Sequence, residues 1–381
     1  MKTDTFPPAI YIDTDAQLRE LVARLADEPL LALDTESNSL YVYRERVCLI
    51  QLSTRDTDYI IDPLAALDIA RLGPLLSDAR IEKVFHAAEY DLICLKRDFG
   101  FKLVNLFDTM IAARICGHKF IGLGNLLGEL MDIEVDKRHQ RDDWGQRPLS
   151  ADSLRYAQMD THYLPALRDH FRKQLAERDR LTEAQETFAE QCHVQPTHHS
   201  FNPQGYWRLA LPNRLTARQA AVLRELYLLR EQIAEERNLP PFKILSDKTL
   251  VAMARKPPRS LAALNGMSGV SGGLVRHAGQ KLLSAINAGL QGDLPEPPPP
   301  EPPADPEVVE LYSALREWRR NRAIARGVES DVIISKDVLW TLAERLPNSL
   351  DDMRDIRGLG PWRLSAYGAE ILEVLHTQNQ K

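Results

Sequence analysis

The stretch Leu30-Leu31-Ala32-Leu33-Asp34-Thr35-Glu36 decides how the rest of the chain is interpreted. Its apolar run predicts a buried strand, and strand alternation places Asp34 and Glu36 on the same face. Two carboxylates this close raise at least one pKa unless a cation lies beside them, which favours a divalent metal or an arginine partner. Taken alone, the stretch also fits a strand end with solvated acids, so the residues downstream decide between the two interpretations.

The composition is that of a soluble globular protein. The chain has 381 residues, which suggests two or three domains, with 44% hydrophobic and 27% charged residues. Its four cysteines form no C-x-x-C pair, so neither a disulfide framework nor a zinc site is expected; they are Cys48, Cys94, Cys116 and Cys192. Neither a signal peptide nor an apolar run of membrane-spanning length is present. We therefore expect a cytoplasmic protein without a membrane contact.

Residues 1 to about 190 alternate strand-like and helix-like patterns. The predicted strands are Ala9–Ile12, Leu30–Asp34, Val47–Leu52, Tyr59–Ile61 and Lys83–Phe85. The predicted helices are Asp15–Ala26, a stretch from Leu64 that breaks at Gly73-Pro74, and most of Glu89–Arg172. Three consecutive strands followed by strand–helix alternation imply a mixed sheet with helices packed on it.

From about Leu215 onward the pattern is helical throughout, and the proline-rich run from Pro295 to Pro303 divides this part in two. Such a run predicts a stiff, extended linker. The expected domains are therefore 1–195 and 212–293, a linker at 294–305, and 306–381.

The two helical parts look like copies of one unit. Residues 245–250 match 334–339, and Gly269 matches Gly358, both at an offset of 89. Leu226-Tyr227 matches Leu311-Tyr312 at an offset of 85, which predicts a four-residue insertion between the copies. Two copies are too few for a solenoid, so a tandem pair of small helical domains is expected.

The copies differ in charge. Residues 212–291 contain 12 Lys/Arg and 5 Asp/Glu, a net +7, whereas residues 305–381 contain 11 and 13, a net −2. The whole chain has a formal net charge of −6, but charge distribution matters more than the total for a nucleic-acid partner. The first copy is the expected surface for a polyanion.

Three further residues complete an acidic pattern. Asp91 follows the strand Lys83–Phe85 and lies about one turn inside the next helix. Tyr156 and Asp160, four apart on a later helix, share one face. The order of acid-x-acid, a later acid, and then Tyr-x-x-x-Asp resembles the tyrosine-bearing subgroup of the DEDD exonuclease superfamily. The histidine subgroup has its histidine at the position of Arg155, which excludes it.

Other segments lie where that superfamily has its supporting motifs. They are Cys48-Leu49-Ile50-Gln51-Leu52, Val84-Phe85-His86, Phe107-Asp108-Thr109, Asp143-Trp144 and Arg147-Pro148-Leu149. The repeated helical unit resembles the helicase-and-RNase-D C-terminal (HRDC) domain. From about Ile10 to about Leu375 the chain therefore resembles the ribonuclease D family. The resemblance implies an α/β ribonuclease H-like nuclease domain with a mixed sheet, followed by two small all-α HRDC-type domains.

The resemblance also implies an activity. It is metal-dependent 3′ to 5′ exoribonuclease action that trims the 3′ ends of structured RNA, such as tRNA precursors, and releases nucleoside 5′-monophosphates. Asp34, Glu36, Asp91 and Asp160 would hold two divalent ions, Mg²⁺ or Mn²⁺, about 4 Å apart, as in two-metal hydrolysis. Tyr156 would orient the attacking water, because a phenol with a pKa of about 10 is a poor base at neutral pH. A monomer bound to RNA with a free 3′ end is expected.

The resemblance adds four substrate-binding candidates, which are Gln51, His86, Trp144 and Arg147. His86 also fits a packed histidine, and Trp144 and Arg147 fit either core and surface positions or the substrate path. Asp108 before a helical run is expected to be an N-cap.

Two other functions fit part of the pattern. A 3′ to 5′ DNA exonuclease of the proofreading or repair type would use the same acids, and only the tandem helical pair favours RNA. A non-enzymatic RNA-binding protein with a decayed nuclease fold is the third reading, and the intact acids with Tyr156 speak against it.

Overall fold

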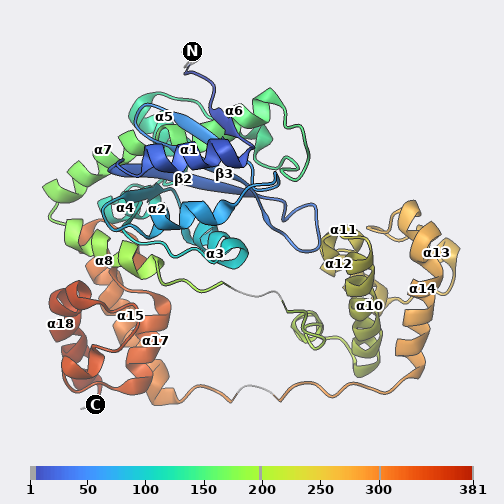
Figure 1. Cartoon of the computed structure of the whole chain (residues 1–381). Helices are drawn as coiled ribbons and strands as arrows, with labels where there is room; N and C mark the ends of the chain where they lie inside the picture. Colours follow the sequence, from blue (N-terminus) through green and yellow to red (C-terminus); the bar gives the residue numbers. More distant parts are fainter. Residues whose placement is uncertain (1–5, 197–199, 300–301, 380–381) are drawn as a thin grey trace. The chain divides into compact units, whose positions relative to one another are not determined.

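The computed structural model describes residues 6–196, 200–299 and 302–379, and the chain forms two compact units (Figure 1). One unit comprises residues 1–37, 47–197 and 303–381, so it contains the N-terminal α/β domain together with the second helical copy. The other comprises residues 38–46 and 198–302, so it contains the first helical copy together with a loop from the N-terminal part of the chain. The sequence predicted neither grouping.

A six-stranded mixed sheet organises the α/β domain, with the strand order β1-β4-β3-β2-β5-β6. The strands are β1 (Ile10–Ile12), β2 (Leu30–Ser37), β3 (Val47–Ser53), β4 (Asp58–Ile61), β5 (Glu82–Phe85) and β6 (Leu106–Asp108). β3 pairs antiparallel with β2 and β4, and the remaining pairs are parallel. The expected mixed sheet is confirmed.

Burial along the central strands explains where the acids emerge. All seven residues of β3 are buried, as expected for a strand covered on both faces. In β2 the four apolar residues Leu30–Leu33 are buried, whereas Asp34 to Ser37 are only partly buried. The apolar half of β2 therefore fixes the strand in the core, and its polar half carries the acids out of the core.

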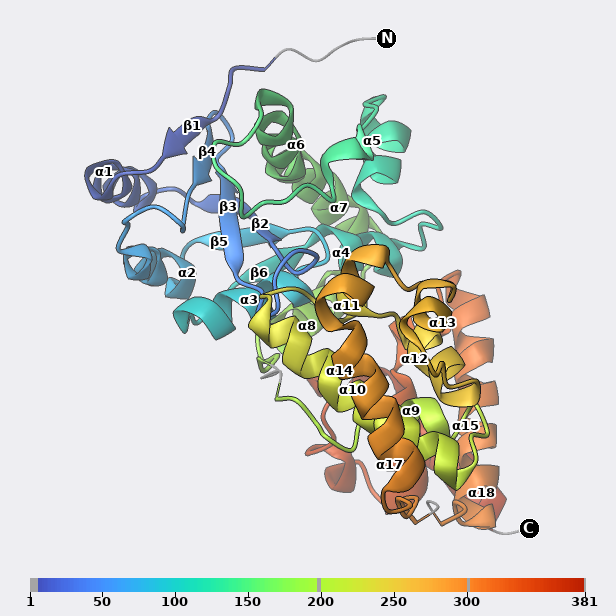
Figure 2. The same cartoon turned by 90° about the vertical axis from the view of Figure 1, so that its right-hand side faces the viewer.

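Helices cover the sheet. They are α1 (Asp15–Leu25), α2 (Gly73–Ser77), α3 (Glu89–Phe99), α4 (Thr109–Cys116), α5 (Leu123–Met131), α6 (Ala151–His162), α7 (Leu164–Glu177) and α8 (Leu181–Gln191). Two short 3-10 helices cover Ile69–Leu72 and Lys137–His139. α6 packs on β2, β3 and β4, and α7 packs on β2 and β5 (Figure 2). The helix that carries Tyr156 and Asp160 therefore lies over the strand that carries Asp34 and Glu36.

Two predictions of local structure were wrong. Residues Leu106–Asp108 were expected within a mostly helical region but form β6, which pairs parallel with β5. Three residues are too few for a strand period to show in the sequence. The helical stretch expected from Leu64 begins only at Ile69, as a 3-10 helix that ends at Leu72. Gly73-Pro74 then begins α2, because the amide that proline lacks has no acceptor in the first turn of a helix.

The two helical copies have corresponding elements. The first contains α9 (Trp207–Ala210), α10 (Ala217–Glu236), α11 (Pro241–Ile244), α12 (Asp247–Arg255), α13 (Leu261–Asn265) and α14 (Gly272–Gln291). The second contains α15 (Pro306–Arg326), α16 (Ser330–Ile333), α17 (Lys336–Arg345), a 3-10 helix (Asp351–Met353) and α18 (Pro361–Asn379). In the first copy the long helices α10 and α14 pack side by side (Figure 2).

The predicted insertion between the copies is wrong. Arg230 donates to the carbonyl of Leu245, and Arg319 donates to the carbonyl of Ile334, so both donors and both acceptors are 89 residues apart. The copies therefore keep one offset throughout. A shift of four residues moves a helix pattern by about one turn and preserves the buried face, which explains the misleading match at an offset of 85.

The segment between the copies has neither helix nor strand in residues 293–299 and 302–305. Among the described residues, no helix has both the length and the apolar character needed to cross a membrane.

Candidate active site

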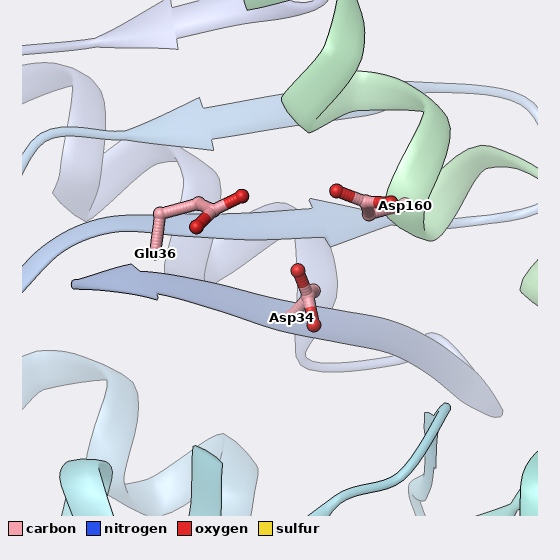
Figure 3. Close-up of side chains that lie close together, drawn as sticks. All are labelled: Asp34, Glu36 and Asp160. Carbon is pink, nitrogen blue, oxygen red and sulfur yellow. The ribbon is translucent and has the colours of Figure 1, made fainter. Parts of the chain in front are cut away.

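The end of β2 and the middle of α6 bring three carboxylates together. Asp34 and Glu36 point from one strand to the same side, and Asp160 points toward them from α6 (Figure 3). One carboxylate oxygen from each residue lies within 4.8 Å of the others. A register shift between Glu36 and Ser37 ends the regular pairing of β2 with β3 directly after the second acid. The predicted grouping of these acids is what the structure contains.

Local sequence fixes the helix that supplies Asp160. Ser150 caps α6 by accepting a hydrogen bond from the amide of Ser153 at 3.0 Å. Tyr156 and Asp160 are one turn apart, and the tyrosine hydroxyl is hydrogen-bonded to the Asp160 carboxylate. The ring of Trp144 lies 6.2 Å from that of Tyr156. Tyr156 is thus held between an aromatic neighbour and an acid of the cluster.

Asp91 is tied to the same strand by its hydrogen bonds. Its Oδ1 accepts from the amide of Thr35 at 3.1 Å and from the Thr35 hydroxyl at 2.5 Å. Thr35 stands between Asp34 and Glu36, so Asp91 is linked to the backbone of the acid-x-acid pair. It lies in the first turn of α3, as expected, and it is buried.

Asp108 positions the turn that leads to Asp91. Its carboxylate accepts from the amides of Ala87 and Ala88, at 3.1 and 2.8 Å, directly before α3. It also accepts from the amides of Met110 and Ile111, so the predicted N-cap of α4 is confirmed. Ala87 has a φ of 63°, a conformation that these two hydrogen bonds stabilise.

Burial and mutual repulsion change the acidity of the cluster. Burial, together with the charges of Asp91, Asp160 and Glu36, holds the pKa of Asp34 well above its usual range. Burial and the charges of Asp160 and Asp91 do the same to the pKa of Glu36. Burial raises the pKa of Asp91 and of Asp160 to about 7. A set of crowded carboxylate oxygens fits hard divalent cations, which would remove the repulsion.

Tyr156 stays protonated in this environment. Burial raises the pKa of its hydroxyl, and the charges of Asp160, Glu36 and Asp34 raise it further. The hydroxyl is therefore a hydrogen-bond donor to a carboxylate or a water, and it is no base at neutral pH.

Gln51 and His86 are both enclosed by protein. Gln51 lies opposite Asp34 on β3 and is fully buried, and within the described residues neither atom of its amide has a hydrogen-bond partner. His86 Nδ1 lies 2.9 Å from the hydroxyl of Thr109, which donates to the carbonyl of Phe85. His86 must therefore donate from Nδ1, which leaves Nε2 of the neutral ring as an acceptor. Burial lowers the pKa of His86 and favours this neutral form.

Trp144 and Arg147 differ in their hydrogen bonding. Trp144 is 1% exposed, and its Nε1 has no partner among the described residues. Arg147 donates twice to Asp62 and once each to the carbonyls of Cys48, Trp144 and Gln146. These five hydrogen bonds use all five donors of a guanidinium, so none is left for a phosphate. The geometry favours a structural role for Arg147 over the expected substrate contact.

Asp142 belongs to the site's surroundings, although the sequence did not single it out. Its charge contributes to the raised pKa of Glu36. Its carboxylate is hydrogen-bonded to His139 at 2.8 Å and to the hydroxyl of Ser153 at 2.7 Å. Asp142 stands in an irregular segment before α6, where no periodicity predicts the direction of a side chain.

Known protein families match most of the chain. A 3′-5′ exonuclease model matches residues 9–176, and an HRDC domain model matches residues 219–286 and 309–375. Ribonuclease D of Gluconacetobacter diazotrophicus is 31% identical over 375 residues, which cover 97% of this chain and 93% of the relative. The chain belongs to the ribonuclease D family. It is a 3′-5′ exoribonuclease, and exonucleases of this kind depend on metal ions.

Two solved structures support this membership. Escherichia coli RNase D, described as an exoribonuclease involved in structured RNA processing, matches with a TM-score of 0.66 and 25% identity, and the match covers 97% of this chain and 99% of that one. The catalytic core of RRP6 from Trypanosoma brucei matches with a TM-score of 0.67 and 30% identity, and the match covers 76% of this chain and 81% of that one. The expected order of a nuclease domain and two HRDC domains is confirmed.

Proposed function

We propose that this ribonuclease D family member hydrolyses the 3′-terminal phosphodiester of RNA by a two-metal route. Asp34, Glu36 and Asp160 would hold the ions together with Asp91. The observation that carries the proposal is the convergence of three carboxylate oxygens within 4.8 Å, beside a fourth acid bonded to the same strand. Two bound Mg²⁺ or Mn²⁺ ions would supply an activated water and stabilise the leaving oxygen.

The chain's own residues have distinct tasks in this proposal. The four acids bind the two ions. Tyr156, which stays protonated, orients the attacking water through its hydroxyl. Because water attacks the phosphorus and the bond to the 3′ oxygen of the preceding nucleotide breaks, the released products are nucleoside 5′-monophosphates. Gln51, His86 and Trp144 are proposed to line the path of the terminal nucleotide.

We further propose that the substrates are structured RNAs with a free 3′ end, such as tRNA precursors. The described role of the E. coli relative in structured RNA processing supports this substrate class. The net +7 charge of residues 212–291 supports the first HRDC copy as the surface for the RNA body. We propose that the protein acts as a monomer in the cytoplasm.

A comparison of labelled substrates tests these proposals. The full chain is incubated with 5′-labelled RNA and DNA of matched sequence, with Mg²⁺, with Mn²⁺ and with EDTA. Stepwise shortening of RNA from the 3′ end with either metal, and none with EDTA, is expected. Faster shortening of DNA than of RNA would favour a DNA exonuclease. Tyr156→Phe should lower the turnover number about 100-fold without changing the metal concentration needed for half-maximal rate.

A further inference from the structure

The loop Asn38–Arg46 begins two residues after Glu36 and ends where β3 begins. Asn38 closes its base, because its amide donates to the carbonyl of Arg46 at 3.4 Å and its Oδ1 accepts from the amide of Arg46 at 3.0 Å. Asn38 is 3% exposed. The whole loop belongs to the compact unit of the first HRDC copy.

Tyr43 is the main contact of this loop within that unit. Its hydroxyl donates to Glu231 Oε1 at 2.6 Å, and its amide donates to Asn238 Oδ1 at 3.3 Å. Its ring packs against the hydrophobic core of the first HRDC copy. Burial and the bond to Glu231 raise the pKa of Tyr43 to about 12, so the hydroxyl remains a donor at neutral pH.

A second contact lies two residues earlier in the loop. The Nζ atom of Lys243 lies 4.0 Å from the centroid of the Tyr41 ring, within cation–π distance. Glu231, Asn238 and Lys243 come from the end of α10, the turn after it, and α11. The loop is therefore held by one side of the first copy through hydrogen bonds, ring packing and a cation.

The strand pairing that supports Glu36 is short on the side of this loop. The pairing of β2 with β3 shifts register between Glu36 and Ser37, and one further pair, Ser37 with Val47, follows before the loop. The position of Glu36 then depends in part on what holds the loop. Metal-binding side chains tolerate only about 0.5 Å of displacement before a site loses its function.

We propose that the first HRDC copy fixes the Glu36 end of β2 through the loop Asn38–Arg46, with Tyr43 as a positioning residue for catalysis. The proposal rests on the assignment of Glu36 to the metal site. It gives the first copy a task beyond RNA binding, since the copy then affects the turnover number at saturating RNA. A copy that only bound RNA would change the Michaelis constant of long substrates alone.

Variants of one hydrogen bond test the proposal. Tyr43→Phe, Glu231→Gln and the double variant are compared in the full chain on a five-nucleotide single strand with saturating Mg²⁺. Each single variant should lower kcat about tenfold, the usual effect of losing a group that orients a metal ligand, and leave KM unchanged. The double variant should equal the stronger single variant, because both changes remove the same bond.

Two further variants complete the test, one as a control and one as a second way to weaken the same contact. Arg44→Ala removes a side chain that is 82% exposed and whose ion pair with Glu235 is long, at 3.4 Å, so it should leave kcat unchanged. Asn238→Gly keeps the left-handed turn, where Asn238 has a φ of 47°, and removes the acceptor of the Tyr43 amide, so it should lower kcat like Tyr43→Phe. Unfolding curves confirm that each variant is folded at the assay temperature.

The outcomes separate this proposal from the one it rests on. If Asp34→Asn is inactive while Tyr43→Phe and Asn238→Gly keep the wild-type kcat, the acids are correctly assigned and the loop is not a positioning element. If Asp34→Asn keeps the wild-type kcat, the assignment of the metal site fails first. An effect of Tyr43→Phe on KM for long RNA alone would show that the loop serves binding only.

Discussion

The two HRDC copies use the same side of their fold for different contacts. In the first copy, the end of α10 and the start of α11 hold the loop Asn38–Arg46 through polar, partly exposed side chains. In the second copy, the corresponding region packs on α8 of the nuclease domain. Val332, which corresponds to Lys243, is part of the nuclease core and is 6% exposed. The first copy therefore uses this region for polar contacts with the loop, and the second copy uses it as a buried interface.

Arginine–glutamate pairs fix the second copy on α8. The two terminal guanidinium nitrogens of Arg326 donate to the carboxylate of Glu183, which is fully buried. Arg363 donates to Glu186 at 2.9 Å and to the hydroxyl of Thr187 at 3.0 Å. These partners are far away in the sequence, so both arginines hold the second copy against α8.

The two copies also differ in how their basic side chains are used. Six of its arginines form ion pairs with carboxylates, and they are Arg320, Arg322, Arg326, Arg345, Arg354 and Arg363. The first copy presents exposed basic side chains, among which are Lys248, Lys256, Arg259 and Arg276. Electrostatic binding of RNA should therefore depend on the first copy.

The largest expected effect comes from the acids of the nuclease domain and not from either HRDC copy. Asp34→Ala removes one acid of the cluster and leaves both copies intact, so turnover should fall far more than tenfold. Single-turnover cleavage of labelled RNA at saturating Mg²⁺ measures the loss. More than about a tenth of wild-type activity in this variant would contradict the assignment of Asp34 as a metal ligand.

The next effect compares matched arginines of the two copies. Arg326→Ala leaves the Glu183 carboxylate buried without its partner, so the free energy of unfolding should fall by about 3 kcal/mol. Arg237, 89 residues earlier, is exposed, and Arg237→Ala should change that free energy by less than about 0.5 kcal/mol. Urea unfolding measures both. A loss of less than about 0.5 kcal/mol for Arg326→Ala would show that its pairing with Glu183 contributes little to stability.

Strand and helix periods in the sequence predicted each half of the acidic cluster because each half is local. Strand alternation places Asp34 beside Glu36, and one helical turn places Tyr156 beside Asp160. The docking of Arg326 on Glu183 and of Tyr43 on Glu231 joins residues more than a hundred positions apart. No local period encodes such pairs.

Arg147 shows a second limit of prediction from the sequence. Its place in the family motif suggested a phosphate contact, whereas its five hydrogen bonds reach Asp62, Cys48 and neighbouring carbonyls. A motif identifies an important residue, but it does not show whether the side chain contacts the substrate or other groups of the protein. Only the assembled β-strands could show which acceptors surround its guanidinium.

A pH series should distinguish the unit with the acids from the unit of the first copy. The pKa of Asp91 and of Asp160 is about 7 in the folded, metal-free protein, against an ordinary value of 3.8. The folded state therefore binds more protons than the unfolded state between these values, and its stability falls as the pH rises from about 4 to about 7. Calorimetry with EDTA should show the Tm of the nuclease transition falling over this range.

Two controls accompany the pH series. Mg²⁺ should restore the Tm of the nuclease transition above pH 7, because the ions bind the ionised acids. Asp34→Asn should raise the metal-free Tm at pH 8, because it removes one charge from the cluster. A transition that belongs to residues 198–302 should respond to neither. A metal-free Tm that is constant from pH 4 to pH 7 would contradict the raised pKa values.

The smallest effect concerns two matched basic residues on the helical copies. Lys256 and Arg345 are 89 residues apart and both are exposed, but Arg345 is bonded to Asp355 at 2.8 Å. If RNA is bound electrostatically by the first copy, Lys256→Ala should reduce the slope of log affinity against log salt by about 0.7, the value for one phosphate of a single strand. Arg345→Ala should leave the slope unchanged, because its charge is already compensated. Titration of a tRNA precursor at several salt concentrations measures both slopes. Equal reductions would mean that the ion pairs of the second copy open to bind RNA, and that the two copies differ less in function than in structure.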